Sequence, residues 1–133
     1  MTNKSIAIAS PCLGNEERDS LDNTLASGWL TQGPKVAQFE QNFANRHEID
    51  YALATTSCTT ALHLALVTLG IGPGDEVIVP AFTWVASSNV VVMCGATPVF
   101  VDVDPTTYNL DSAAVARALT PKTKAVMPVH LFG

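Results

Sequence analysis

Charged side chains are scarce in this 133-residue sequence, and basic ones are the scarcest. Charged residues make up 14% of the chain, whereas a soluble domain usually carries about 25%. The net charge is −5, and a nucleic-acid partner would require a basic surface, so the composition argues against one. With 47% apolar residues, the chain has little polar surface, which predicts that further protein covers part of it.

Cysteine is also rare, and Cys12, Cys58 and Cys94 are odd in number and widely spaced. This pattern predicts neither a disulfide framework nor a zinc site, and no two histidines show metal-ligand spacing. Reduced thiols are typical of a cytoplasmic protein. The chain opens without a signal-peptide core, and the apolar run over residues 85–93 is too short to cross a bilayer. We therefore expect a cytoplasmic protein without a membrane or metal partner, of a length that suits one small domain.

No phosphate-binding loop of the GxxxxGK[ST] type is present, and the glycine-rich stretch at residues 70–74 is wrongly placed for a dinucleotide site. It follows a predicted helix and precedes a predicted strand, whereas a dinucleotide fingerprint follows a strand and opens a helix. We interpret it as a helix end followed by a turn. The sequence therefore disfavours a Rossmann-type nucleotide binder.

The sequence does contain a regular alternation of short apolar strands and helix-sized segments. Four strands are predicted, at residues 51–55, 76–79, 98–103 and 124–129. Three helices separate them, at residues 58–69, 83–94 and 112–119, and two more precede them, at 15–26 and from Pro34 onward. Alternating strands and helices favour βαβ units. The expected fold class is α/β, a three-layer α/β/α arrangement around a mostly parallel sheet. The helix over residues 83–94 is apolar on every side, which predicts burial on every side.

The turn after the first predicted strand is built of small hydroxyl residues and leads straight into a helix. A helix N-terminus offers free backbone N–H groups and the positive end of the helix dipole, so anions bind there readily. One interpretation is a phosphate cradle, in which Ser57, Cys58, Thr59 and Thr60 supply hydrogen-bond donors. The other is an ordinary N-cap that stabilises its own helix.

Two further sites follow predicted strands, where ligands bind in open α/β sheets. Trp84 is either a core anchor or a flat surface for a planar ligand. Asp102 and Asp104 either contact a substrate or form an ordinary turn. A phosphate cradle one strand away from Trp84 would suit a planar phosphorylated cofactor.

Five motifs stand in a fixed order along the chain. They are SGWLTQGP at 27–34, TSCTTALHLAL at 56–66, GPGDEVIVPAFTWVA at 72–86, GATPVFVDVD at 95–104 and PVHLFG at 128–133. In this order and spacing they resemble the N-terminal part of the DegT-like sugar aminotransferases, pyridoxal-phosphate enzymes of fold type I. The resemblance implies a homodimer that uses pyridoxal 5′-phosphate to transfer an amino group, usually from glutamate, to a nucleotide-linked keto sugar.

The resemblance also implies roles for particular residues. Cys58 and Thr59, beside Ser57, fall where the family binds the cofactor phosphate, and Trp84 falls where an aromatic side chain stacks on the pyridine ring. Trp29 and Thr31 lie in a segment that the family places near the substrate and the dimer interface.

Two segments of the chain are expected to have different roles. The resemblance assigns residues 1–50 to a helical segment on the substrate and dimer-interface side. Residues 51–133 would form the N-terminal part of the large domain that binds pyridoxal phosphate, and this domain would be incomplete.

The sequence departs from the family at two places. Glycine is common in the family where this chain has Cys58, and glycine allows a closer backbone approach. The family's Schiff-base lysine, and the acid that pairs with the pyridine nitrogen, come later than residue 133. The four lysines present match neither position: Lys4, Lys35, Lys122 and Lys124. We therefore expect no catalytic residue, and no activity, in this chain alone. Two alternatives to an aminotransferase remain: a non-catalytic protein of the same descent, or a related sugar dehydratase.

Overall fold

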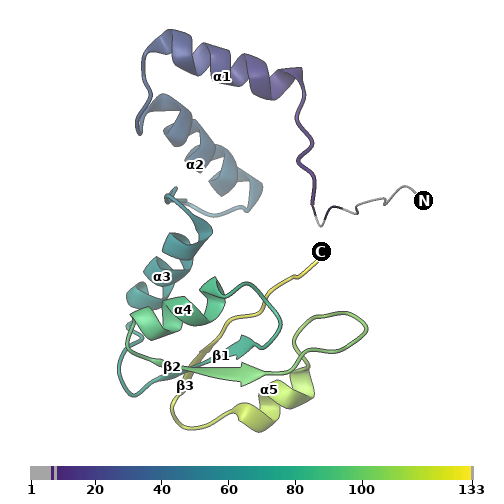
Figure 1. Cartoon of the computed structure of the whole chain (residues 1–133). Helices are drawn as coiled ribbons and strands as arrows, with labels where there is room; N and C mark the ends of the chain where they lie inside the picture. The colour runs from purple at the N-terminus through teal and green to yellow at the C-terminus, as the bar shows by residue number, and fades with distance from the viewer. Residues whose placement is uncertain (1–6, 8, 133) are drawn as a thin grey trace, which may run out of the picture. The chain divides into compact units, whose positions relative to one another are not determined.

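Contacts along the chain divide it after Ala54 into two units. The first holds two helices, and the second holds the sheet and three more helices (Figure 1). The computed structural model describes residue 7 and residues 9–132. Lys4 and Gly133, named above, lie outside the described residues.

The first unit is a pair of helices, α1 (Asn15–Ser27) and α2 (Pro34–Arg46), close to the two that the sequence predicts. Gly28 ends α1 in the left-handed conformation, with φ of 69°, and its N–H donates to the carbonyl of Leu25 at 3.1 Å. Glycine adopts this backbone without the cost that a Cβ would bring. Pro34 opens α2 at the first helical position, where its missing N–H has no partner to lose.

Most apolar side chains of the first unit are exposed within the described chain. Leu21 and Leu25 share one face of α1, as their spacing predicts, yet neither is buried. Among the described residues of this unit, only Ala44 is buried. These exposed apolar side chains are consistent with the small number of polar residues in the sequence.

The predicted strand over residues 51–55 is wrong, because this segment is irregular. Within the described residues, this segment pairs with none of the three strands of the sheet. Its backbone finds a side-chain partner instead, since the N–H of Ala54 donates to Oε1 of Glu40 on α2 at 2.8 Å. Leu53, expected to be buried, is 70% exposed.

The second unit is built on three parallel strands, β1 (Glu76–Pro80), β2 (Thr97–Val101) and β3 (Thr123–Val126). Their order is β2-β1-β3, with β1 in the centre. The predicted parallel sheet is confirmed, although β2 and β3 end earlier than expected. Beyond β2, Val103 pairs in antiparallel fashion with Leu110, which turns the chain away from the sheet.

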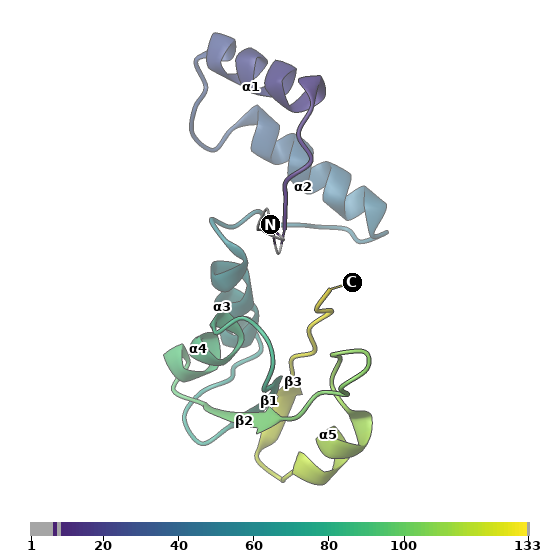
Figure 2. The ribbon, with the colours of Figure 1, turned by 45° about the vertical axis from the view of Figure 1, so that its right-hand side comes forward.

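The predicted three-layer arrangement is also confirmed. Helices α3 (Cys58–Thr68) and α4 (Ala86–Met93) pack against each other, and α4 contacts β1 and β2. Helix α5 (Ser112–Ala118) contacts β2 from the other side, so α4 and α5 lie on opposite sides of the sheet (Figures 1 and 2).

The core lies between the sheet and the α3–α4 layer. Val77 and Val79 alternate onto this side of β1 and pack with Val90 and Val91 of α4 and with Leu66 of α3. All four valines are inaccessible to solvent. Burying four such side chains contributes about 1.5–3 kcal/mol each, which makes this cluster the main stabilising contact of the unit.

Helix α4 is only partly covered within the described chain, so the predicted burial on every side would require the further protein that the composition predicts. Its face toward α3 and the sheet is covered, but Val92 and Met93 are each 60% exposed. No described element packs on that outer face. Within the described residues, no helix has the length and apolar character needed to cross a membrane.

The glycine-rich stretch ends α3, as the sequence predicts. Gly70, with φ of 71°, donates its N–H to the carbonyl of Val67 at 3.0 Å. Gly74, with φ of 93°, lies in the turn that leads into β1, and the N–H of Gly72 donates to the Asp75 carboxylate at 3.0 Å. The stretch is therefore a helix end and a turn.

Val90→Ala and Val92→Ala form a matched pair that tests this packing. Both lie in α4, remove the same methyl groups and change helix propensity equally, but only Val90 is buried. We expect Val90→Ala to lower the free energy of unfolding by about 1–3 kcal/mol, through lost burial and a cavity. Val92→Ala should change it by less than about 0.5 kcal/mol. Urea denaturation followed by circular dichroism measures both, and equal losses would contradict the packing of α4.

Candidate functional site

The start of α3 is capped by its own hydroxyl groups. Ser57 has an extended backbone, and its Oγ accepts the N–H of Thr60 at 3.1 Å. The Thr60 hydroxyl lies 3.0 Å from Ser57 Oγ and 3.1 Å from the hydroxyl of Thr56. The N-cap interpretation of this turn is therefore correct.

The cap leaves two backbone donors of the first turn free. Among the described residues, no acceptor pairs with the N–H of Cys58 or of Thr59. Cys58 is exposed and Thr59 is half-buried, so both can be reached by a ligand. Free N–H groups at the positive end of a helix dipole attract anions. The cap and the predicted cradle are therefore compatible, because they would use different N–H groups.

These donors open into a pocket of about 510 Å³ at the carboxyl edge of the sheet. Three segments form its walls: the start of α3, the β1–α4 connection and the segment that follows β3. The residues that line it are Cys58, Thr59, Leu62, Thr83, Trp84, Ala86, Ser87, Met127, Pro128, Val129 and His130.

Trp84 is a wall of this pocket and is not a core anchor. Its side chain is 78% exposed, so the core interpretation of this residue is wrong. The carbonyl of Trp84 accepts the N–H of the buried Ser87 at 3.1 Å, which joins the residue to the first turn of α4. A planar ligand can therefore lie against the indole.

The donors of the pocket fit a phosphate joined to a planar ring. The N–H groups of Cys58 and Thr59 would hold the phosphate, and Trp84 offers a flat apolar face beside them. Ser57 does not line the pocket, and its Oγ is occupied by the cap. No acidic side chain lines the pocket, so nothing repels an anion there. Across residues 7 and 9–132, no cluster of three His, Cys, Asp or Glu side chains could hold a metal ion.

The two aspartates after β2 do not join this site. Asp104 accepts the N–H groups of Thr106 and Thr107, both at 2.8 Å, so it forms the turn. These N–H groups, that of Thr107 first, hold the pKa of the Asp104 carboxyl below its ordinary value. Asp102 is exposed and accepts the N–H of Val103 at 3.2 Å. The turn interpretation is therefore correct for Asp104, and neither residue lines the pocket.

Sequence reasoning missed the third wall of the pocket. Residues 127–130 follow β3, and the N–H of Met127 still bonds to the carbonyl of Ile78 in the neighbouring strand at 2.9 Å. This bond fixes the start of the wall, which ends at the exposed His130. The available signal was the position of the segment after a parallel strand, where ligands bind.

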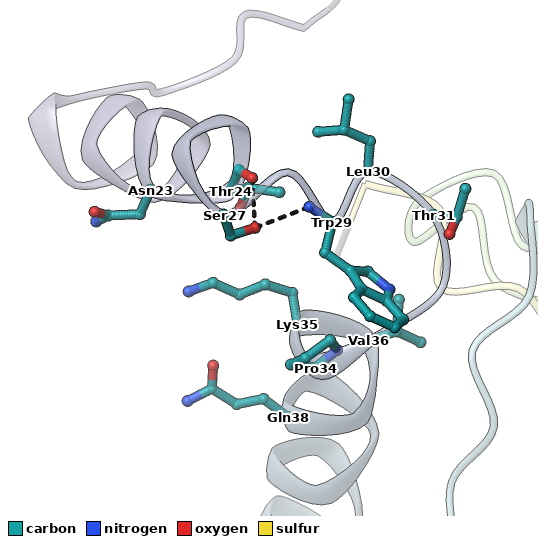
Figure 3. A pocket seen from close by; sticks show the side chains of 10 residues that line it. All are labelled: Asn23, Thr24, Ser27, Trp29, Leu30, Thr31, Pro34, Lys35, Val36 and Gln38. Carbon is teal, nitrogen blue, oxygen red and sulfur yellow. Dashed lines mark hydrogen bonds between the residues drawn. The ribbon is translucent and has the colours of Figure 1, made fainter.

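A second pocket, of about 540 Å³, lies in the first unit and contains Trp29 and Thr31 (Figure 3). The indole Nε1 of Trp29 donates to the carbonyl of Gln32 at 2.9 Å. A Cβ on Gly33 would stand 1.9 Å from that nitrogen, so a side chain there would displace the ring. The loop therefore gives the Trp29 ring its position through one hydrogen bond and the space above Gly33.

The walls of this second pocket come from the end of α1, the following loop and the start of α2. Lys35 is the only charged side chain among the ten residues that line it. Figure 3 shows Lys35 and Gln38 of α2 reaching toward the side of α1 that carries Asn23 and Ser27. The pocket thus combines an aromatic ring, one cation and several hydroxyl and amide groups.

The second unit thus combines a parallel α/β sheet with a pocket in which free N–H groups at a helix start lie beside an exposed indole. The model of the DegT/DnrJ/EryC1/StrS aminotransferase family matches residues 11–133, so the chain belongs to this family. GDP-perosamine synthase of Caulobacter vibrioides is 51% identical over 129 residues, which are 96% of this chain and 35% of that protein. The chain thus spans about a third of the length of this curated relative.

Solved structures agree with this assignment. 3-Amino-5-hydroxybenzoic acid synthase superposes with a TM-score of 0.83 at 50% identity, over 94% of this chain and 33% of that one. Spr1654 from Streptococcus pneumoniae, assigned as a sugar aminotransferase and solved in its PMP form, superposes with a TM-score of 0.85 at 40% identity. That match covers 95% of this chain and 32% of the other. The predicted family and fold are confirmed.

The cap at Ser57 can be tested by two substitutions of the same residue. Ser57→Ala removes the Oγ that accepts the Thr60 N–H, and we expect a loss of about 1 kcal/mol in the free energy of unfolding. Ser57→Gly should cost only about a few tenths of a kcal/mol, because glycine tolerates the N-cap position. Urea denaturation measures both. Full stability of the Ala variant would show that the cap contributes nothing.

The Asp104 turn makes a prediction for acid conditions. The pKa of the Asp104 carboxyl is lowered in the folded state. The ionised carboxylate therefore contributes its full stabilisation of the fold above an unfolded-state pKa of about 3.9. That contribution is lost as pH falls through the folded-state pKa. Asp104→Asn should therefore lower the urea midpoint at about pH 6, and the gap to the parent chain should shrink toward about pH 3. Asp102→Asn is the control, and a gap independent of pH would contradict the turn's role.

Proposed function

We propose that this chain forms the N-terminal part of a pyridoxal-phosphate-dependent aminotransferase. The observation that carries the proposal is the pocket in which the free N–H groups of Cys58 and Thr59 share a cavity with the Trp84 ring. Membership of the aminotransferase family supports it, and so does a structural relative solved in its PMP form.

In this proposal each wall of the pocket has one task. The N–H groups of Cys58 and Thr59 bind the phosphate at the helix start, which Ser57 caps. Trp84 orients the pyridine ring by stacking and keeps water from that face. When bound, pyridoxal phosphate supplies an electron sink for amino-group transfer.

We further propose a sugar carried on a nucleotide as the acceptor of the amino group, which usually comes from glutamate. The name of the Caulobacter relative, a GDP-sugar synthase, supports this substrate class. Trp29 and Thr31 would contact the substrate from the second pocket. Residues 1–50 would then form the substrate and dimer-interface side, and residues 51–133 part of the cofactor-binding domain.

A homodimer in the cytoplasm is part of the same proposal. The exposed apolar faces of α1 and α4 support association with further protein. The cysteines Cys12, Cys58 and Cys94 are free thiols, as a reducing compartment would keep them.

The stacking role of Trp84 can be measured with pyridoxamine 5′-phosphate, which has no aldehyde and does not react with surface lysines. We expect Trp84→Ala to weaken its binding by about 1 kcal/mol, close to a fivefold rise in Kd, because an aromatic stacking contact is lost. Isothermal titration calorimetry measures this Kd. Trp29→Ala, which removes the indole of the first unit, is the matched control and should leave Kd unchanged. An unaltered Kd for Trp84→Ala would remove Trp84 from the cofactor site.

A further inference from the structure

Three aromatic side chains meet at the carboxyl edge of the sheet, outside the pocket itself. The ring of Tyr108 lies between Phe82 and Phe132, with centroid distances of 5.7 Å to each. The Tyr108–Phe132 pair is edge to face, with an interplanar angle of 87°, which is a favoured geometry for aromatic rings. Each ring comes from the connection after a different strand, so Tyr108 bridges the connections that follow β1 and β3.

The backbone of this cluster is unusual. Glu48, Tyr108 and Phe132 are the described non-glycine residues with positive φ, and two of the three belong to the cluster. Tyr108 has φ of 59° and Phe132 has φ of 64°. A bulky residue in this conformation is uncommon and persists only where its surroundings impose it. Both rings of this pair thus stand on backbone that their residue types rarely adopt.

Hydrogen bonds within the β2–α5 loop hold Tyr108 in this conformation. Its N–H donates to the carbonyl of Asp104 at 2.8 Å, and the N–H of Asp104 donates to the carbonyl of Asn109 at 2.9 Å. The pairing of Val103 with Leu110 closes the loop at its base. The loop lies beside the segment after β3 in both views (Figures 1 and 2). It thus presents the Tyr108 ring on a fixed support.

The cluster is joined to two walls of the pocket through short stretches of chain. Phe82 comes two residues before Trp84, and Phe132 comes two residues after His130. Tyr108 itself does not line the pocket. Through its two ring contacts it links the connection that carries Trp84 to the segment that follows β3.

We propose that Tyr108 is a positioning residue that holds Trp84 and the segment after β3 at the separation a planar phosphorylated ligand needs. The inference deepens the proposed function and rests on it, because it concerns the same pocket. The ring of Tyr108 supplies the contact, and its hydroxyl is not required. Loss of the ring would leave both walls in the fold but free to move apart.

The test uses the whole chain in a Trp29→Phe background, so that Trp84 is the only tryptophan. Tyr108→Gly removes the ring and also relieves the backbone, since glycine adopts positive φ freely. Tyr108→Phe keeps the ring. Phe132→Ala removes the outer ring, which is 74% exposed, and so keeps the test usable if the Tyr108 variant fails to fold. Tyr51→Gly, at the other tyrosine, is the matched control.

Two readouts separate positioning from general stability. Time-resolved fluorescence anisotropy reports the local motion of Trp84, and titration with pyridoxamine 5′-phosphate gives Kd. We expect Tyr108→Gly and Phe132→Ala to increase the amplitude of Trp84 motion and to raise Kd about fivefold, the equivalent of one aromatic pair. Tyr108→Phe and Tyr51→Gly should match the parent in both.

The outcomes distinguish this inference from the proposed function. Unchanged Trp84 motion in both ring-deletion variants overturns the inference, as does increased motion with an unchanged Kd. If Trp84 motion rises in both variants but the parent chain does not bind pyridoxamine 5′-phosphate, Tyr108 positions the wall, and residues 1–133 alone do not make up the proposed cofactor site. A rise in Kd for Tyr108→Phe would show that the hydroxyl is required for binding, and this result would overturn the inference as well.

Discussion

The parallel pairing of β1 with both of its neighbours is the constraint on which the second unit depends. Because β2, β1 and β3 run in the same direction, their carboxyl ends share one edge, and the connections that follow them meet there. That edge gathers the Trp84 wall, the Asp104 turn and the segment after β3. The shared direction of the strands thus brings residues from distant parts of the sequence to a single pocket.

The pairing in turn depends on the apolar cluster that covers one side of β1. Val77 and Val79 bury their side chains against α4, and α4 packs on α3. This packing orients the start of α3 toward the carboxyl edge, where Cys58 and Thr59 line the same cavity as Trp84. The stability of the unit and the geometry of the pocket are therefore coupled, because the contact that holds the helices also orients the N–H groups of Cys58 and Thr59.

The turn before α3 caps its own helix and still leaves hydrogen-bond donors for a ligand. Ser57 uses its side chain to satisfy one N–H of the first turn, and the preceding N–H groups stay available. Asp104 differs from Ser57 in this respect, because its carboxylate accepts two N–H groups of its own turn and does not line the pocket. Its contribution to the pocket is indirect, through the loop that presents Tyr108. A residue at a ligand-binding edge can thus act by shaping the chain that surrounds the site.

The sequence alone determined the family, the parallel sheet and most helices, because these depend on local signals. Gly28 and Pro34 mark helix ends by their backbone limits, and the motifs around Ser57 and Trp84 keep their order and spacing whatever the packing. The tertiary structure decided what depends on partners far along the chain. Within the described residues, the segment 51–55 has the composition of a strand but pairs with no other strand. Helix α4 is apolar nearly all round, but the described chain covers it on one side only. Trp84 could be core or surface by composition, and only the arrangement of three connections at one edge exposed its ring to a ligand.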